Sequence, residues 1–276
     1  MLFRQDWKSA CNLRFVTLKR LLKQRQPLFH PETTMSLRSP HGLRRLVGFS
    51  LLASLLLVTP LWAELPIPPE LTGLTSPGGQ SRLLDSEFKQ AYWPLSIFFE
   101  TQKNQAYCSV ASSVMVLNAL GVPRPVVSAW PDFTFFTQDD FFAKVDPALA
   151  NPATVAKEGM TLMQLAEVLK TFPVAVEPHF GQDLSLESFR ELLKRGVNSP
   201  ARLALANFNR KLIYQVGGGH WSPVAAYHAP SDSVLLMDVA RYKYPPVWVT
   251  VKDLYESVRS VDDTSHRSRG LILVSR

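Results

Sequence analysis

The chain offers a candidate nucleophile, Cys108, and a candidate base, His220. Cys108 lies in QAYCSVASSVMVLNAL, where a polar loop gives way to an apolar, helix-like segment. The reactive form of cysteine is the thiolate, which a helix N-terminus and a neighbouring histidine both favour. Free cysteine more often packs as a small buried residue. Cys108 is therefore a nucleophile only if the fold brings a histidine to it from elsewhere in the chain.

His220, in GGGHWSPVAAYH, is the histidine that the pattern favours for this role. The three glycines before it either let the backbone approach another group closely or form a flexible hairpin tip. Asp238, in LLMDVARYKYPP, is an acid within an apolar segment, and a buried carboxylate needs a partner. The sequence thus offers a histidine and an acid that could orient it.

A hairpin would bring these two residues together in one register and not in another. A turn centred on Ala229 places His220 opposite Asp238, on the same face of the sheet. A turn centred on Ser231 separates them by four positions, roughly 13 Å at ~3.3 Å per residue. If the pair forms, Asp238 should favour the imidazolium, which would lower the pKa of the Cys108 thiol.

Gln102 lies six residues before Cys108 and could help to bind an oxyanion. A side-chain amide in this loop can donate a hydrogen bond together with the Cys108 backbone N–H. Taken by itself, Gln102 could equally be a surface glutamine.

The elements that would position these residues are helical first and extended later. Apolar spacing predicts a helix over residues 109–120, stopped by Gly121 and Pro123. Further helices are predicted over residues 161–172, with a capping box of Thr161 and Gln164, and over residues 185–196, with a stop at Gly196. The C-terminal third is rich in β-branched and aromatic residues and predicts strands in HWSPVAAYH, SVLLMDVA, PVWVTV and GLILVS. This order predicts an α+β fold with an antiparallel sheet.

The basic charge of the chain is concentrated in its first 63 residues. They hold ten of the 30 Lys and Arg residues and two of the 23 acids, which leaves 20 bases and 21 acids beyond them. This excludes a basic nucleic-acid-binding domain over residues 64–276. Residues 35–63 resemble a signal peptide, with Arg44 and Arg45 before an apolar stretch and Ala63 at the cleavage position. We expect export to a periplasm after cleavage. The alternative is a membrane anchor formed by residues 46–63, and Met35 is an alternative start.

Composition predicts the domain boundaries, and the number of cysteines limits the disulfides and metal sites that the chain could form. Residues 64–80 are rich in Pro and Gly and predict a linker or extended arm, and residues 81–276 predict one domain. Cys11 lies in the leader, so a mature chain would carry Cys108 alone and could form no internal disulfide. A zinc site built on several cysteines is excluded as well.

Three longer motifs resemble the phytochelatin synthase family: FETQKNQAYCSVASSVMVLNALGV, GGGHWSPVAAYH and MDVARYKYPPVWV. The resemblance covers about residues 81–276, and its motifs are ordered Cys, His, Asp. It implies a papain-like cysteine-protease fold. It also implies cleavage of the Cys–Gly bond of glutathione by Cys108, with a γ-glutamylcysteinyl thioester passed to a second glutathione or to water.

The resemblance assigns roles residue by residue. Cys108, His220 and Asp238 would form the triad, and Gln102 the oxyanion site. Arg241 would meet a substrate carboxylate, with Arg269 as a second candidate for this contact, and Ser109 would line the acyl site. Plant members carry a Cys-rich C-terminal domain that is not found in residues 1–276, so we expect the chain to resemble short bacterial-type members, in which hydrolysis tends to prevail over polymerisation.

The resemblance implies no required cofactor. Cd²⁺ or Zn²⁺ would enter as glutathione thiolates, either as substrates or as activators, in a heavy-metal response. We expect glutathione and these metal thiolates as partners, and the oligomeric state stays open, with a homodimer as one alternative. Two other functions stay open as well: a papain-like peptidase or amidase on another substrate, and a non-catalytic protein that binds glutathione or metal thiolates.

Overall fold

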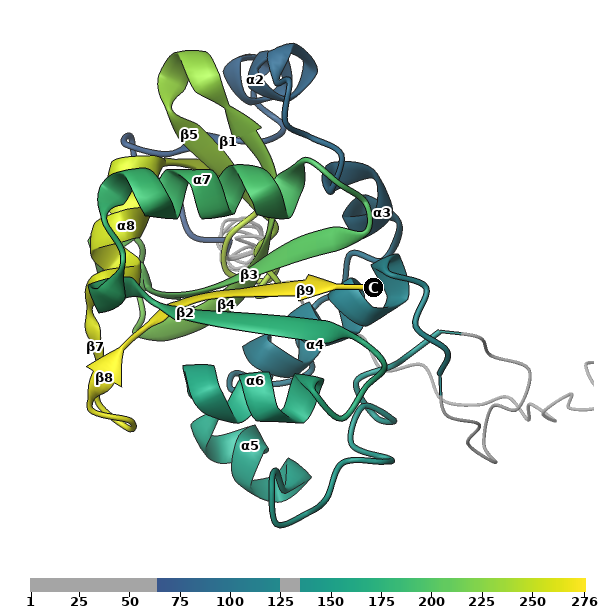
Figure 1. The fold of residues 1–276 in the computed structure, drawn as a ribbon. Coiled ribbons are helices and arrows are strands. Elements are labelled where there is room, and N and C mark those ends of the chain that lie inside the picture. Colours follow the sequence, from purple (N-terminus) through teal and green to yellow (C-terminus); the bar gives the residue numbers. More distant parts are fainter. Residues whose placement is uncertain (1–63, 125–134) are drawn as a thin grey trace, which may run out of the picture. The chain divides into compact units, whose positions relative to one another are not determined.

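The computed structural model describes residues 64–124 and 135–276. Within this part of the chain lies a seven-stranded sheet whose neighbouring strands are all antiparallel (Figure 1). Its strands, in spatial order, are β1 (Thr72–Gly73), β6 (Val247–Thr250), β5 (Ser233–Leu236), β4 (Gly219–His228), β3 (Arg202–Asn209), β9 (Gly270–Ser275) and β2 (Ala175–Phe180). A separate hairpin pairs β7 (Val261–Asp262) with β8 (Arg267–Ser268). The combination of helices and antiparallel sheet confirms the predicted α+β class.

Helices cover both faces of the sheet. Figure 1 shows α7 on one side of the central strands, with α4 and α6 on the other. α4 packs against β4, α6 against β2 and β9, and α7 against β3 and β4. The helices are α2 (Pro77–Asp85), α3 (Tyr92–Ile97), α4 (Cys108–Ala119), α5 (Pro152–Glu158), α6 (Leu162–Leu169), α7 (Leu186–Val197) and α8 (Val251–Arg259), with 3-10 turns η1 (Gly181–Asp183), η2 (Arg210–Ile213) and η3 (Ala229–Ser231).

Most of the helix starts and stops predicted from the sequence are confirmed. α4 stops in a Schellman motif: Gly121 has a φ of 63°, and the Val122 N–H donates to the Leu117 carbonyl at 2.9 Å. α6 begins with the predicted capping box of Thr161 and Gln164. α4 differs from the usual surface helix, because eleven of its twelve residues are buried. It is a core helix, and its N-terminus therefore delivers Cys108 to the interior.

The predicted stop at Gly196 is wrong. α7 continues to Val197, and Gly196 lies inside it, against β3. A Cβ at residue 196 would lie 2.5 Å from the Cβ of Ala204. This glycine therefore serves close helix–sheet packing rather than helix termination.

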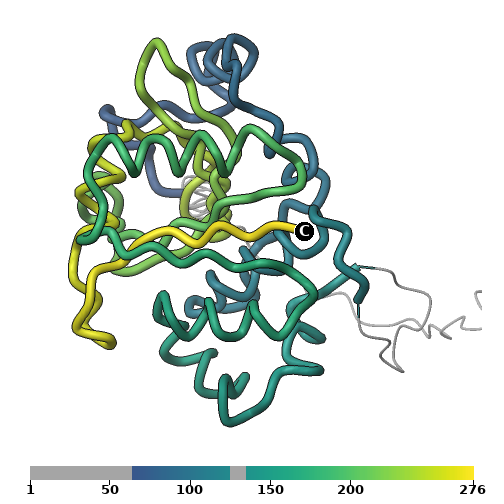
Figure 2. The backbone as a smooth tube through the Cα atoms, in the orientation of Figure 1, coloured from purple at the N-terminus to yellow at the C-terminus, as the bar shows by residue number. Residues whose placement is uncertain are grey.

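Two strands of the sheet, β2 and β3, come from the middle of the chain, whereas the predicted order places the helices before the strands. β2 and β3 flank α7, and Figure 2 shows the C-terminal strand β9 running between them. The predicted strand PVWVTV ends at Thr250, whose side chain caps α8 by accepting from the Asp253 N–H. β3 is buried at six of its eight residues and so lacks the alternation of a half-buried strand, and α8 is only nine residues long; neither is among the predicted elements.

The segment 64–80, predicted as a linker or extended arm, makes contacts with the sheet domain. Thr72 and Gly73 pair with β6, and the Leu65 N–H donates to the Lys243 carbonyl at 2.9 Å. The predicted boundary at residue 81 therefore cuts through α2. Proline marks the first turn of this helix at Pro77, and Ser76 caps it, so this proline begins a helix rather than a flexible stretch.

Two predictions about the N-terminal segment fall outside the described residues. These are the signal-peptide-like stretch 35–63 and the apolar stretch 46–63 as a membrane anchor. Between residues 64 and 276, with 125–134 left out, no helix is long and apolar enough to cross a membrane.

Candidate active site

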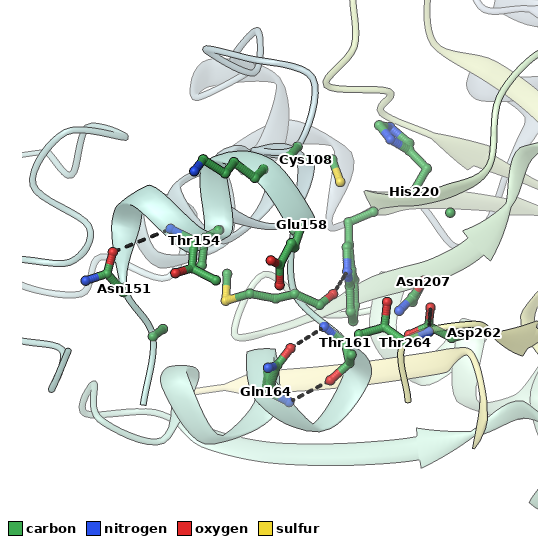
Figure 3. Close-up of a pocket in the computed structure, with 18 of the residues that line it drawn as sticks. Cys108, Asn151, Thr154, Glu158, Thr161, Gln164, Asn207, His220, Asp262 and Thr264 are labelled. Atoms are coloured by element: carbon green, nitrogen blue, oxygen red, sulfur yellow. Dashed lines mark hydrogen bonds between the residues drawn. The ribbon is translucent and has the colours of Figure 1, made fainter. Parts of the chain in front are cut away.

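Cys108 and His220 line one cavity of about 610 Å³. This volume lies within the range of small-molecule sites in proteins. Figure 3 shows both side chains at the upper edge of the cavity, the Cys108 sulfur on the side of its helix where His220 lies. Polar side chains from α5, α6, β3 and the β7–β8 hairpin surround the space below them, including Thr154, Glu158, Thr161, Gln164, Asn207, Asp262 and Thr264.

Cys108 is the first residue of α4, as the sequence predicts. The preceding residue, Tyr107, supplies no side-chain cap to the N–H groups of the first turn. The first N–H groups of a helix have no partner within it, and the helix dipole favours negative charge at this end. The helix N-terminus therefore favours negative charge here, on the sulfur or on an oxyanion beside it.

His220 and Asp238 form the predicted pair, with 2.9 Å between Nε2 and Oδ1. Both are buried, at 4% and 1% exposure. Neither of the two hairpin registers compared in the sequence is observed: His228 pairs with Ser233 and Val224 with Leu236, so the turn is centred between Ala229 and Ser231. Asp238 also follows β5 instead of lying within it.

A β-bulge explains why the pair still forms. The register shifts between Val224 and Ala226, which brings the two strands one step back toward the predicted alignment. The Met237 N–H then donates to the Pro223 carbonyl at 2.9 Å. In this alignment Asp238 is a diagonal neighbour of His220 on the same face, a separation that long side chains can span.

Arg210, which the sequence analysis missed, holds Asp238 from its other side. Its Nη1 and Nη2 donate to the two carboxylate oxygens at 2.7 and 2.8 Å, and the Ala240 N–H donates to Oδ1 at 2.8 Å. Arg210 is only 3% exposed and lies in η2, directly after β3. Its position between Asn209 and Lys211 in the sequence carries no motif, so only the tertiary contact identifies it.

The pKa values of Cys108 and His220 respond to burial as well as to their charged neighbours. Burial raises the pKa of the Cys108 thiol, while backbone N–H groups of Trp221 and Ser109 act in the opposite direction. Burial lowers the pKa of His220, and the nearby Arg210 charge adds to this, against the effect of Asp238. Both shifts favour the uncharged forms, a thiol and a neutral imidazole, whereas Asp238 favours the imidazolium, as the sequence predicts.

Gln102 is buried beside the loop that carries Asp238. Its backbone N–H donates to the Val239 carbonyl at 2.8 Å. Its Nε2 donates to the Asn104 carbonyl at 2.8 Å and to the Tyr242 hydroxyl at 3.0 Å. Its Oε1 is buried and has no hydrogen-bond partner among the described residues. The amide is therefore not a surface group, although its oxyanion role stays a prediction.

Of the two predicted substrate arginines, Arg269 lines the cavity. It is 8% exposed and donates to Asn207 Oδ1 at 3.1 Å and to Asp262 Oδ1 at 3.4 Å. Its buried Nε has no partner in the part of the chain that the structure describes. Gly219 allows this approach, since a Cβ there would lie 2.4 Å from Arg269 Nη1. The glycine before His220 thus serves close packing, one of the two alternatives that the sequence offers.

The other two predicted substrate-binding residues lie outside the cavity lining. Arg241 is exposed, and its guanidinium stacks over the Phe99 ring at 4.6 Å from the centroid. Ser109 is fully buried behind Cys108, and its hydroxyl has no hydrogen-bond partner among residues 64–124 and 135–276. Their roles stay predictions.

The sequence has clear relatives. Residues 62–271 match the family model described as Phytochelatin synthase. A Lotus japonicus protein named glutathione gamma-glutamylcysteinyltransferase 1 is 30% identical over 216 residues, covering 77% of this chain and 42% of the relative. An Arabidopsis thaliana protein of the same name is 30% identical over 218 residues, covering 77% and 43%. A Schizosaccharomyces pombe protein named glutathione gamma-glutamylcysteinyltransferase is 27% identical over 195 residues, covering 70% and 45%. The chain thus spans less than half the length of these relatives.

Proposed function

Because the chain belongs to the phytochelatin synthase family, we propose that it is a cysteine acyltransferase that acts on glutathione. The observation that carries the proposal is the hydrogen-bonded His220–Asp238 pair, whose histidine lines the same cavity as the helix-terminal Cys108. A nucleophile, a base and a residue that orients the base are the parts that acyl transfer requires. We further propose a papain-like fold, which the buried Cys-bearing helix packed on an antiparallel sheet supports.

In the first half-reaction, His220 takes the proton of the Cys108 thiol, and the sulfur adds to the carbonyl carbon of the Cys–Gly bond. The oxyanion accepts hydrogen bonds from the Cys108 N–H and Gln102. The C–N bond then breaks, and glycine leaves with the proton that His220 returns. The products are free glycine and a γ-glutamylcysteinyl thioester on Cys108.

In the second half-reaction, water or the amine of a second glutathione attacks the thioester carbonyl. His220 takes one proton from the attacking group, the C–S bond breaks, and the proton passes to the Cys108 sulfur. Water as the acceptor gives γ-Glu-Cys, and glutathione gives (γ-Glu-Cys)₂-Gly. Asp238 keeps the imidazole oriented in both steps, and Arg210 fixes Asp238 in turn.

The charges of the cavity fit the γ-glutamyl group, which carries an α-carboxylate and an α-ammonium. Arg269 supplies a guanidinium, which suits a carboxylate. Glu158, Asp262 and Asp263 line the same cavity and supply carboxylates for the ammonium. We expect metal ions to enter as glutathione thiolates, and we propose export of the chain on the basis of its signal-peptide-like segment.

Product analysis tests the proposal. The full chain is incubated with glutathione, with and without Cd²⁺, and the products are read by mass spectrometry beside Cys108→Ser and Cys11→Ser. We expect glycine release that disappears in Cys108→Ser, because Cys108 lines the cavity with His220, and that persists in Cys11→Ser, because Cys11 belongs to the leader-like segment of the sequence. (γ-Glu-Cys)₂-Gly would identify a synthase, and γ-Glu-Cys alone a hydrolase. Absence of glycine release from the unaltered chain would overturn the glutathione assignment.

A further inference from the structure

The side-chain amide of Gln102 has no free N–H in this structure. An amide nitrogen carries two donors, and the Asn104 carbonyl and the Tyr242 hydroxyl accept from it at 2.8 and 3.0 Å. Gln102 is 4% exposed, so neither donor can turn to bulk water. An oxyanion can therefore bind to Gln102 only if one of these two acceptors is exchanged for it.

The Asn104 carbonyl is the acceptor that is harder to remove. It belongs to the backbone of the loop before α4, and it also accepts from the Tyr107 N–H at 3.2 Å. The Asn104 side chain holds the same loop by accepting from the Ala106 N–H at 3.0 Å. Releasing this carbonyl would require the loop that leads into Cys108 to change shape.

The Tyr242 hydroxyl is the acceptor that can move. Its side chain is 47% exposed, so rotation about its side-chain bonds costs little packing. Burial raises the pKa of its hydroxyl, and a negative charge on Cys108 would raise this pKa further. The phenol is therefore neutral at physiological pH, and it lies within electrostatic range of the sulfur that the reaction uses.

We propose that Tyr242 is a positioning residue whose hydroxyl oxygen occupies, in the free protein, the place on the Gln102 amide that the oxyanion takes in the reaction. It keeps the buried N–H satisfied and aimed, and it gives way when the substrate carbonyl arrives. The inference rests on the proposed function, because it assumes that Gln102 serves the oxyanion.

This exchange has a measurable cost. The hydroxyl of Tyr242 must leave Gln102 before the oxyanion can bind, so its hydrogen bond is a barrier to acylation. Tyr242→Phe removes the acceptor but keeps a ring that shields the amide from water. We expect acylation of Cys108 to become about two- to tenfold faster, which is the value of one net hydrogen bond. In a Gln102→Ala background, the same change should have no effect, since the amide is absent.

The test uses two acyl donors in the full-length chain. Glycine release from glutathione measures the proposed reaction, and the burst of p-nitrophenolate from p-nitrophenyl acetate measures acylation of Cys108 by a donor without a γ-glutamyl group. Tyr214→Phe is the matched control: its side chain is 46% exposed, and its hydroxyl contacts Asp253 at 3.3 Å instead of Gln102. We expect it to leave both rates unchanged.

The outcomes separate the inference from the proposed function. A rate increase with p-nitrophenyl acetate, without any glycine release, would support the role of Tyr242 while overturning the glutathione assignment. A decrease in Tyr242→Phe would mean that the hydroxyl donates to the oxyanion and would overturn the inference. An unchanged rate, or an increase that persists in Gln102→Ala, would overturn it as well.

Discussion

Replacing Arg210 with methionine should destabilise the fold severely, because it leaves a buried carboxylate without its main partner. The ion pair with Asp238 lies at 2.7 Å, and its side chains are only 4% and 2% exposed. Removing one member of such a pair costs about 3–5 kcal/mol. The Arg210 guanidinium also packs 5.5 Å from the centre of the Tyr244 ring, and methionine retains part of that packing.

Urea and thermal unfolding of the full-length chain measure this cost. For a domain of this size, 1 kcal/mol corresponds to roughly 2–4 °C in Tm, so we expect a loss of about 6–20 °C. Lys170→Met is the control, because its pair with Glu167 is exposed at 47% and 45% and should contribute less than about 1 kcal/mol. Adding Asp238→Asn removes the uncompensated charge, so the double variant should be less destabilised than Arg210→Met alone.

The same variant should change the titration of His220. The Arg210 charge lowers the pKa of His220, so its removal should raise this pKa and move the acidic limb of any activity profile upward. The reasoning about Asp238 would be refuted by an Arg210→Met protein that unfolds within about 1 kcal/mol of Lys170→Met. It would also be refuted if Asp238→Asn failed to relieve the loss.

Three further predictions concern the site and its support. With burial and Arg210 holding the pKa of His220 below 6.5, and burial holding that of Cys108 above 9.0, kcat/KM should stay level between these values in a pH series; a midpoint above 6.5 on the acidic side would contradict this. Gly219→Ala should displace the Arg269 guanidinium and raise KM for glutathione, whereas Gly218→Ala, whose added Cβ meets nothing within 4 Å, should leave steady-state kinetics unchanged. Gly196→Ala should cost about 1–3 kcal/mol in urea unfolding, because its Cβ would lie 2.5 Å from that of Ala204; a loss below ~0.5 kcal/mol would show that α7 can shift away from β3.

The sequence by itself determined the elements whose signals are local. The ends of α4, the capping box of α6 and the strands β4 and β9 depend on residues a few positions apart, so spacing and turn chemistry predict them. The position of Cys108 at a helix start follows from the same local pattern. The family resemblance, drawn from three motifs, is likewise a property of the sequence, and the family match confirms it.

Only the tertiary structure decided which side chains meet. The bulge near Ala225 sets the alignment of His220 with Asp238. It could not be predicted, because no local sequence signal indicates a bulge in an apolar strand. Arg210 reaches Asp238 across 28 positions, and Tyr242 reaches Gln102 across 140. Burial also sets the charges of Cys108 and His220, because desolvation depends on what the whole fold packs around them. The sequence therefore identifies the candidate residues of the site, whereas the fold determines their partners, their distances and the shifts of their pKa values.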